Sequence, residues 1–477
     1  MTLRVGSPSM SARALASLLA NWRGTTAAPA YTALADRIRL LIVDGRIPLG
    51  TRIPAERDLA AQLELSRTTV TSAFGVLRDV GYLRSIRGSG SVARLPERPL
   101  AAGDAGPGDY LDFTKAAVSA APGIATAAEE AAAELPSYLG GSGFEPVGLP
   151  VLRAAIAERY RLRGLPTEPE QIMVTIGAQH AIALLARTLL GRGDSVLVES
   201  PSYPHAYEAL RSTGARLVPV SVTTDSGWDV AGLEQGLRRT CPAMAYVMPD
   251  FHNPTGSTMA PELRQRMLAL AAGEGTVVVA DETMADLSLD GTPYHPLAAH
   301  GEAVSIGSLG KTVWGGIRIG WIRAERPLIQ RLARARSAGD LGTPILEQLI
   351  AARLLGDYDA ILASRRAQLL AGRDHLAAAL RGHFPQWRVP DVDGGLTLWV
   401  NLGTPVSSQL TIAAQSRGLL IAAGPRFGLD GAFERFLRIP FSYPPDETDR
   451  AVGILASAWQ SLSSAPVPEP AFLADVV

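Results

Sequence analysis

Residues 308–320 read Ser-Leu-Gly-Lys-Thr-Val-Trp-Gly-Gly-Ile-Arg-Ile-Gly, and Lys311 within them is one of two lysines in a chain of 477 residues. The other is Lys115, and all remaining basic residues except the histidines are arginines. A site that needs only positive charge can use arginine, whereas imine formation with an aldehyde requires an amine that can lose its proton. An arginine-rich composition explains why lysine is scarce. For Lys115 this explanation and chance are enough, and no chemical role is inferred. The residues around Lys311 favour a chemical role.

Six short apolar runs precede this stretch and predict strands that are covered on both faces: Ile172–Thr175, Ser195–Val198, Leu217–Val220, Ala245–Met248, Thr276–Ala280 and Ala303–Ile306. Helical segments alternate with them, which is typical of an α/β fold with a mostly parallel sheet. Ligands of open α/β sheets bind beyond the carboxyl ends of the strands. Polar residues just after these strands are therefore candidate site residues.

Three of the strands are followed by motifs suited to a phosphorylated aromatic ligand. Gly177, Ala178 and Gln179 follow the first strand and open a helix, whose backbone N–H groups can bind a phosphate. Tyr203, in Pro-Ser-Tyr-Pro, offers an aromatic ring for stacking. Asn253, in His-Asn-Pro-Thr-Gly, offers an amide to a ring oxygen, although this motif alone could be a turn.

Two further motifs complete the pattern. Asp281 ends the fifth strand, where a carboxylate can keep a pyridine nitrogen protonated and make the ring an electron sink. An aspartate at a strand end is as often only a helix cap. Ser308 and Arg318 flank Lys311 and can contact a phosphate, while Lys311 supplies the imine. The order and spacing of all five motifs favour a single site.

The first hundred residues differ from the rest in charge. Residues 1–98 contain 14 arginines and seven acids, a net charge of +7, so the remainder carries −8. A basic small segment joined to an acidic large one suggests a polyanionic partner for the first.

The pattern of this basic segment predicts helix, helix, turn, helix and hairpin. Helices are expected over residues 15–22 and 31–43, then from Pro54 towards Leu65, and from the N-cap Ser66 to Asp79. Short strands at residues 81–85 and 91–93 flank a glycine-rich turn. This is the order of a winged helix-turn-helix. A helical domain with a merely solvated basic face is the alternative, and it leaves the loop glycines unexplained.

The helix after Ser66 presents small donor-rich residues to a major groove, because arginine can pair with guanine and Ser and Thr reach phosphates or bases. The candidate DNA-binding residues are Ser66, Arg67, Thr68 and Thr69 on this helix, with Arg52, Arg57, Arg84 and Arg87 around it. The stretch IPLGTRIPAERDLAAQLELSRTTVTSAFGVLRDVGYLRSIRGSGSVA resembles the GntR-type winged helix. Glu64 departs from that family, which usually has Gly in the turn, and the departure predicts a turn that is stiffened or strained.

Residues 111–460 resemble the fold type I aminotransferases, which use pyridoxal 5′-phosphate (PLP). The resemblance implies a mostly parallel sheet with a smaller C-terminal α+β subdomain. It assigns Lys311 to the PLP Schiff base, Asp281 to the pyridinium, Asn253 to the ring hydroxyl and Tyr203 to ring stacking. The phosphate falls to Gly177, Ala178, Gln179, Ser308 and Arg318, with Tyr138 reaching the phosphate of the neighbouring subunit. Arg438, in Arg-Phe-Leu-Arg-Ile-Pro, would bind an α-carboxylate.

Two departures from the aminotransferase pattern bear on catalysis. The family usually has a tyrosine soon after the pyridinium aspartate, where this chain has Thr283 and Met284. Gly310 precedes the lysine where Ser is common. Both argue against efficient transamination and leave cofactor binding unaffected.

The joined segments resemble the MocR-type transcriptional regulators. The expected domains are a winged helix-turn-helix at 12–95, a Pro/Gly-rich linker at 96–110, the PLP-binding domain at 111–460 and a flexible tail at 461–477. The resemblance implies a homodimer, paired head-to-tail, that binds a DNA operator and responds to an amine, an amino acid or PLP itself. The alternative is a working aminotransferase with a tethering N-terminal domain, and steady-state turnover would distinguish the two.

The remaining composition fits a cytoplasmic protein that joins the nucleoid when DNA-bound. The single cysteine, Cys241, excludes an internal disulfide framework. No apolar run reaches the roughly 18 residues of a transmembrane helix, and the N-terminus lacks the pattern of a signal peptide. No motif predicts a metal site.

Overall fold

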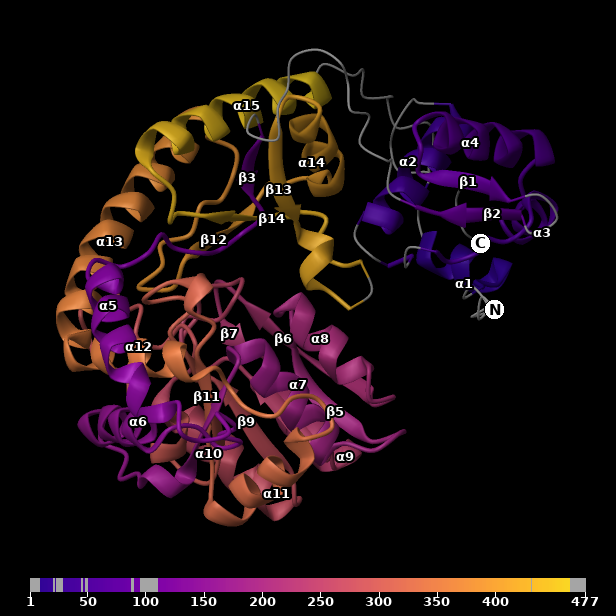
Figure 1. Cartoon of the computed structure of the whole chain (residues 1–477). Coiled ribbons are helices and arrows are strands. Elements are labelled where there is room, and N and C mark those ends of the chain that lie inside the picture. Colours follow the sequence, from indigo (N-terminus) through magenta and orange to yellow (C-terminus); the bar gives the residue numbers. More distant parts are fainter. Residues whose placement is uncertain are drawn as a thin grey trace. The chain divides into compact units, whose positions relative to one another are not determined.

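The computed structural model describes residues 9–19, 22, 29–43, 46–47, 50–86, 90–94, 110–429 and 431–463 (Figure 1). The chain divides into two compact units. The first contains the residues up to Tyr110 together with Ser408–Gly418 and the residues from Leu455. The second contains Leu111–Ser407 and Leu419–Ile454.

The N-terminal residues form the winged helix-turn-helix that the sequence predicts. Its elements are α1 (Ala12–Leu19), α2 (Ala30–Val43), α3 (Glu56–Gln62), α4 (Arg67–Asp79), β1 (Leu83–Ile86) and β2 (Gly90–Ala93). The strands pair antiparallel, with Leu83 opposite Ala93. Helix α1 ends three residues before Trp22, which lies in a turn.

Helix α4 begins where the sequence predicts, because Ser66 Oγ accepts a hydrogen bond from the backbone N–H of Thr69 at 3.1 Å. Phe74 and Leu77 on its inner face are buried in one core with Leu34 and Ile38 of α2. Burying one such side chain contributes about 1.5–3 kcal/mol. The packing therefore holds the outward-facing start of α4 on a rigid support.

The second unit is built on an eight-stranded sheet in the order β4-β11-β10-β9-β8-β5-β6-β7. The strands are β4 (Ile172–Thr175), β5 (Ser195–Ser200), β6 (Arg216–Thr223), β7 (Gly227–Trp228), β8 (Met244–Val247), β9 (Val277–Asp281), β10 (Val304–Ser308) and β11 (Gly320–Arg323). All six predicted strands are present, and neighbours from β10 through β6 pair in parallel. The antiparallel strands β7 and β11 were not predicted.

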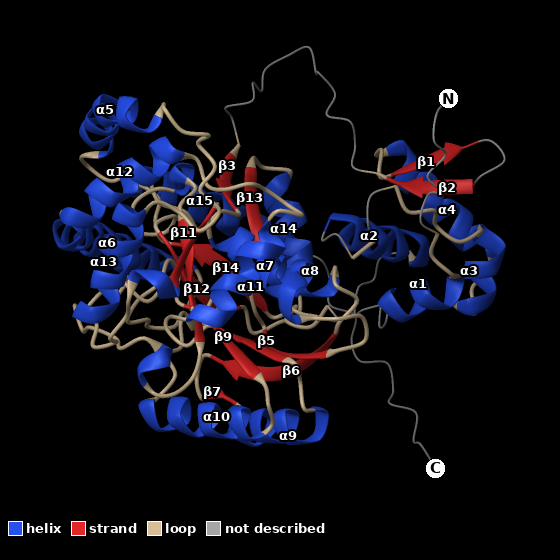
Figure 2. Ribbon diagram, turned by 60° about the horizontal axis from the view of Figure 1, so that its bottom comes forward, coloured by secondary structure: helices blue, strands red, loops and turns tan. Residues whose placement is uncertain are grey.

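Helices cover both faces of this sheet, as its apolar strands require (Figure 2). Helices α7 (Ala178–Leu189), α8 (Pro204–Arg211) and α11 (Arg326–Arg336) pack on one face, and α9 (Val230–Thr240) and α10 (Pro261–Gly273) on the other. Neighbouring residues of one strand face opposite cores, as Val196 and Leu197 show. The other helices of this part of the chain are α5 (Ile124–Glu134), α6 (Pro150–Leu162), α12 (Ile345–Gly356) and α13 (Tyr358–His383).

A smaller four-stranded sheet forms the C-terminal subdomain, in the order β12-β14-β13-β3. Its strands are β3 (Leu111–Phe113), β12 (Thr397–Asn401), β13 (Leu419–Ala423) and β14 (Phe436–Pro440), and helices α14 (Ser407–Gln415) and α15 (Pro445–Ser463) complete the sequence. Strand β3 pairs in parallel with β13, so the segment that follows the predicted linker joins the far end of the chain.

Candidate functional site

The predicted motifs meet at one edge of the eight-stranded sheet. Strand β11 is antiparallel to both β4 and β10, so these two run in the same direction, as do β9, β8 and β5. Their carboxyl ends therefore share an edge. Thr175, Asp281 and Ser308 end β4, β9 and β10, while Tyr203 and Asn253 follow β5 and β8.

Lys311 lies in the turn after β10, and its Nζ donates a hydrogen bond to the carbonyl oxygen of Ala116 at 2.5 Å. Burial lowers the pKa of Lys311 to about 8, from an ordinary value of 10.5, and the positive charge of Arg438 acts in the same direction. The charge of Asp281 opposes the shift. These interactions place Lys311, Arg438 and Asp281 in one electrostatic environment and make the neutral amine accessible near neutral pH.

Arg438 projects from β14 and is only 6% exposed. Its guanidinium donates to the carbonyl oxygen of Thr114 and lies 4.8 Å from the centre of the Phe427 ring. Its Nε is buried and has no hydrogen-bonding partner among the described residues. Burial lowers the pKa of Arg438 to about 10, so the group still carries its charge. A buried guanidinium with an unused N–H suits a carboxylate ligand.

The segment Thr114–Ala116 connects these two cations. Its first and last carbonyl oxygens accept hydrogen bonds from Arg438 and Lys311. The Tyr443 hydroxyl donates to the carbonyl oxygen of Lys115 between them, at 3.1 Å. This segment was not predicted, because nothing in its local pattern signals a contact with residues about two hundred or more positions away.

Asp281 is 4% exposed and is held by two donors. The Tyr246 hydroxyl donates to Oδ2 at 2.6 Å, and the backbone N–H of Thr283 donates to Oδ1 at 3.1 Å. Burial raises the pKa of Asp281, while both hydrogen bonds oppose the rise. Tyr246 was missed by the sequence analysis; a tyrosine inside the apolar run Ala245–Met248 was the available signal, since buried phenols usually find a partner.

The predicted phosphate-binding residues lie together at the start of α7. Gly177 has φ +77°, and a side chain there would meet the Arg318 guanidinium at 2.9 Å. Arg318 donates to the carbonyl oxygen of Ile176 at 2.9 Å. Ser308 Oγ accepts from the backbone N–H of Gly310 at 3.0 Å. The first backbone N–H groups of α7 have no partner within the helix, so they can bind an anion beside this arginine.

Asn253 and Tyr203 line the same region. Asn253 is 7% exposed, and its Oδ1 has no hydrogen-bonding partner among the described residues. Tyr203 is half-buried, and burial together with the charge of Asp281 raises its pKa to about 12. Its pKa also responds to the charges of Arg438 and Arg318, so the ring lies between the two ends of the site.

Tyr138 lies apart from this group in the described contacts. It ends the short 3-10 helix η1 (Leu135–Tyr138), packs beside Ala131, Leu149 and Leu349, and its hydroxyl lies 3.4 Å from Glu134 Oε1. The contact of Tyr138 with the phosphate of a neighbouring subunit stays a prediction. The turn after Asp281 contains Thr283 and the buried Met284, and neither of them offers a phenol to the site.

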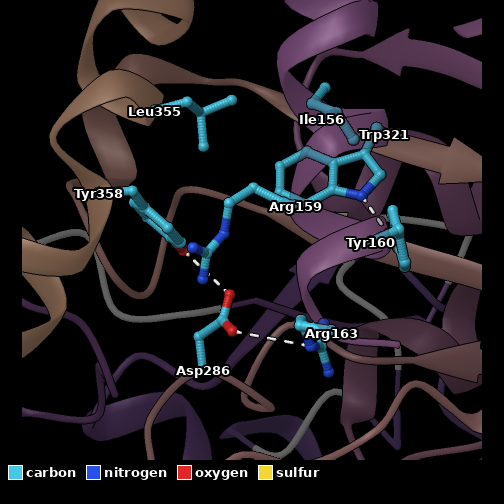
Figure 3. Close-up of a pocket in the computed structure, with 8 residues that line it drawn as sticks. All are labelled: Ile156, Arg159, Tyr160, Arg163, Asp286, Trp321, Leu355 and Tyr358. Carbon is cyan, nitrogen blue, oxygen red and sulfur yellow. Dashed lines mark hydrogen bonds and ion pairs between the residues drawn. The ribbon is translucent and has the colours of Figure 1, made fainter. Parts of the chain in front are cut away.

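A small cavity lies among side chains of α6, β11, α12 and α13 (Figure 3). It is lined by Ile156, Arg159, Tyr160, Arg163, Asp286, Trp321, Leu355 and Tyr358. The Tyr358 hydroxyl lies 3.1 Å from Asp286 Oδ2 and 2.9 Å from Oγ1 of Thr312, the neighbour of Lys311. The free volume of ≈ 10 Å³ is about that of one water. The cavity therefore supports the lysine turn and does not hold a cofactor.

The candidate DNA-binding residues lie on the surface of the winged helix. Arg67 and Thr68 are exposed at the start of α4, and Ser66 Oγ lies 2.7 Å from Thr69 Oγ1. Arg52, Arg57 and Arg84 are exposed as well, whereas Arg87 lies outside the described residues.

The turn before α4 contains the predicted irregularity. Glu64 adopts the left-handed conformation, with φ +54°, which is strained for a residue with a side chain. The turn therefore keeps a backbone conformation that suits Gly, although the residue at this position is Glu64.

Comparison with known families assigns both parts of the chain. Residues 108–455 match the aminotransferase class I and II family, and residues 30–92 match the bacterial regulatory proteins of the gntR family. Among the described residues, no helix combines the length and apolar character needed to cross a membrane.

Individual relatives match either most of this chain or its larger part. The chain is 30% identical to the "Probable rhizopine catabolism regulatory protein MocR" of Rhizobium meliloti, over 82% of this chain and 85% of that one. It is 27% identical to the uncharacterized HTH-type transcriptional regulator YdfD of Bacillus subtilis, over 87% and 93%. Among solved structures, the α-aminoadipate aminotransferase LysN of Thermus thermophilus superimposes with a TM-score of 0.68 at 28% identity, over 75% of this chain and 94% of that one.

The residues at the sheet edge fit PLP. A lysine with a lowered pKa, an unpartnered buried amide oxygen at Asn253 and a helix N-terminus that excludes a Cβ at Gly177 match an aldehyde, a ring hydroxyl and a phosphate. The chain belongs to the aminotransferase class I and II family, and with its gntR-family winged helix it is a MocR-type transcriptional regulator that binds DNA and pyridoxal 5′-phosphate.

Proposed function

We propose that this regulator senses an amine that carries a carboxylate, such as an amino acid, through PLP held by Lys311. The observation that carries the proposal is the segment Thr114–Ala116, whose carbonyl oxygens accept hydrogen bonds from both Lys311 and Arg438. The amine that would hold the cofactor and the guanidinium that would hold a carboxylate are therefore neighbours. An α-amino acid carries both an amine, which reacts with the PLP aldehyde, and a carboxylate, which suits a guanidinium.

Each remaining residue of the site has a proposed role towards the cofactor. When bound, PLP supplies an aldehyde carbon that reacts with amines and a ring that accepts electrons. Asp281 would hold the ring nitrogen protonated, the Asn253 amide oxygen would accept from the ring hydroxyl and Tyr203 would stack on the ring. The phosphate would be bound by Gly177, Ala178, Gln179, Ser308 and Arg318, with Tyr138 contributed by the other subunit of a dimer.

Arg438 gives the site a way to report occupancy. In this structure its guanidinium donates to the Thr114 carbonyl oxygen. A carboxylate adds opposite charge and can accept two parallel N–H bonds from one guanidinium, which a neutral carbonyl oxygen cannot. An amino acid at Arg438 would therefore displace Thr114 and release the segment that leads back towards the winged helix.

The output of the proposed sensor is DNA binding. Ser66, Arg67, Thr68 and Thr69 would meet an operator in the major groove, with Arg52, Arg57, Arg84 and Arg87 on the flanking backbone. We further propose that the chain works in the cytoplasm, at the nucleoid, as a head-to-tail homodimer, so that one effector event acts on two winged helices.

A second candidate function is catalytic transamination. The same constellation of Lys311, Asp281 and Arg438 would support it, while Thr283 and Met284 leave the turn after Asp281 without a phenol. A steady-state assay with amino donors and a keto acid distinguishes the two. Multiple turnovers at ordinary enzyme rates would contradict a purely regulatory role.

The proposal is tested by titrating the PLP-loaded chain with amino acids and with the matching amines that lack a carboxylate. We expect that only the amino acids change the spectrum and alter the affinity for DNA. The DNA fragments are first selected from a random library. Lys311→Ala should lose the cofactor absorbance after dialysis. Arg438→Met should lose the preference for amino acids, while Arg435→Met, an exposed arginine of the same segment, should keep it. Equal responses to both ligand series would refute the proposal.

A further inference from the structure

Ile176, just before the proposed phosphate cradle, is held by side chains at both its backbone N–H and its carbonyl oxygen. Its N–H donates to Nδ1 of His180 at 3.1 Å. Its carbonyl oxygen accepts from Arg318 at 2.9 Å. The next residue is Gly177, whose positive φ directs the chain into α7. The orientation of the two peptide units on either side of Ile176 therefore sets where the first N–H groups of α7 point.

These contacts determine the protonation of His180. A ring nitrogen that accepts from a backbone N–H carries no proton itself, so Nδ1 is the bare nitrogen. Nε2 is buried and lies 2.9 Å from Asp340 Oδ2, but outside hydrogen-bond geometry, so it has no hydrogen-bonding partner among the described residues. A carboxylate at this distance favours the proton on Nε2. His180 is thus the neutral tautomer with hydrogen on Nε2.

Asp340 is itself fixed in place. Its Oδ1 accepts from Arg336 Nε at 2.7 Å and from the backbone N–H of Gly342 at 3.0 Å. Arg336 is fully buried and also donates to the carbonyl oxygen of Val174 in β4 at 2.7 Å. The carboxylate that orients His180 is therefore tied to the strand that leads into the cradle.

We infer that His180 is a positioning residue for the phosphate of PLP: oriented by Asp340, its Nδ1 holds the Ile176 N–H so that Gly177 and the start of α7 bind the phosphate. The inference rests on the proposed phosphate role of Gly177, Ala178 and Gln179. No sequence motif pointed to His180 or Asp340, which lie 160 positions apart.

Acid should weaken this arrangement. The charged groups that face His180 are Asp340, Arg336 of α11 and Arg187 of its own helix. Burial lowers the pKa of His180 below its ordinary 6.5; Asp340 opposes the shift and both arginines add to it. The imidazole ring of His180 therefore stays neutral at any pH above its lowered pKa. As the pH falls through the lowered pKa, a proton on Nδ1 would face the Ile176 N–H, and the hydrogen bond would be lost.

The test compares three full-length variants by their dissociation constants for PLP, measured by fluorescence quenching of the cofactor-free chain. His180→Phe keeps the ring volume and removes the acceptor, and should weaken PLP binding about tenfold, the loss of roughly one hydrogen bond. His180→Asn places an amide oxygen near the position of Nδ1 and should retain affinity within about twofold. Asp340→Asn presents an amide N–H to Nε2, favours the wrong tautomer and should resemble His180→Phe.

The pH profile separates positioning from packing. As the pH falls below 6.5, towards the lowered pKa of His180, wild-type affinity should fall more steeply than that of His180→Asn. In the cofactor-free protein, the Ile176 amide should exchange hydrogen faster in His180→Phe than in wild type. This measurement needs no bound cofactor.

Arg318→Ala separates the inference from the proposed site. If Arg318→Ala weakens PLP binding and His180→Phe does not, the role of His180 is wrong and the phosphate cradle stands. If neither variant weakens binding, the cradle itself is wrong. Unchanged Ile176 exchange in His180→Phe, or parallel pH profiles of wild type and His180→Asn, would also overturn the inference.

Discussion

Replacing Arg438 with methionine should raise the pKa of Lys311 and slow the covalent attachment of PLP at neutral pH. The pKa of Lys311 is lowered to about 8, first by burial and second by the positive charge of Arg438. Methionine has a similar length and no charge, so it removes the repulsion while keeping the amine buried. Asp281, which favours the ammonium form, remains in place.

The structure sets the scale of this effect. With a pKa of about 8 the amine is about 24% neutral at pH 7.5, whereas at the ordinary value of 10.5 it would be about 0.1% neutral, roughly 240-fold less. Burial accounts for the larger share of the shift and is retained in the variant. We therefore expect a several-fold slower attachment at pH 7.5, and not the full difference.

The assay mixes cofactor-free chain with PLP and follows attachment by absorbance as a function of pH. Only the neutral amine attacks the aldehyde, so the midpoint of the rate profile reports the pKa of Lys311. Arg435→Met is the matched control, because Arg435 lies three residues away and is exposed. An unchanged midpoint in Arg438→Met, or an equal shift in the control, would refute the electrostatic coupling.

Three other substitutions test separate parts of the molecule. Glu64→Gly should relieve the left-handed backbone at φ +54° and stabilise the helix-turn-helix by about 1 kcal/mol, seen as slower hydrogen exchange in α4. Tyr246→Phe removes a hydrogen bond that lowers the pKa of Asp281, so PLP affinity should be lost at a higher pH on acidification than in wild type; superimposed profiles would contradict this. Arg67→Ala should cost about 1–3 kcal/mol of DNA binding and relax the sequence preference, measured by fluorescence anisotropy against selected fragments.

Much of the fold follows from local pattern. Runs such as Ser195–Val198 are apolar on both faces, which only a covered parallel sheet accommodates, and the six predicted strands are all found. Strand β11 was missed because Gly320–Arg323 is short and follows the phosphate motif directly. Its place between β4 and β10 depends on pairing partners that lie elsewhere in the chain.

The sequence by itself determined the order of elements, the winged helix ahead of the α/β unit and the residue types at the strand ends, because each depends on neighbours within one strand or one helical turn. Only the tertiary structure decided the electrostatics of the site. Tyr246 reaches Asp281 across 35 positions, Lys311 reaches Ala116 across 195 and Arg438 reaches Thr114 across 324. The lowered pKa of Lys311 and the tautomer of His180 arise from burial and from charges brought together by folding, so no local pattern encodes them.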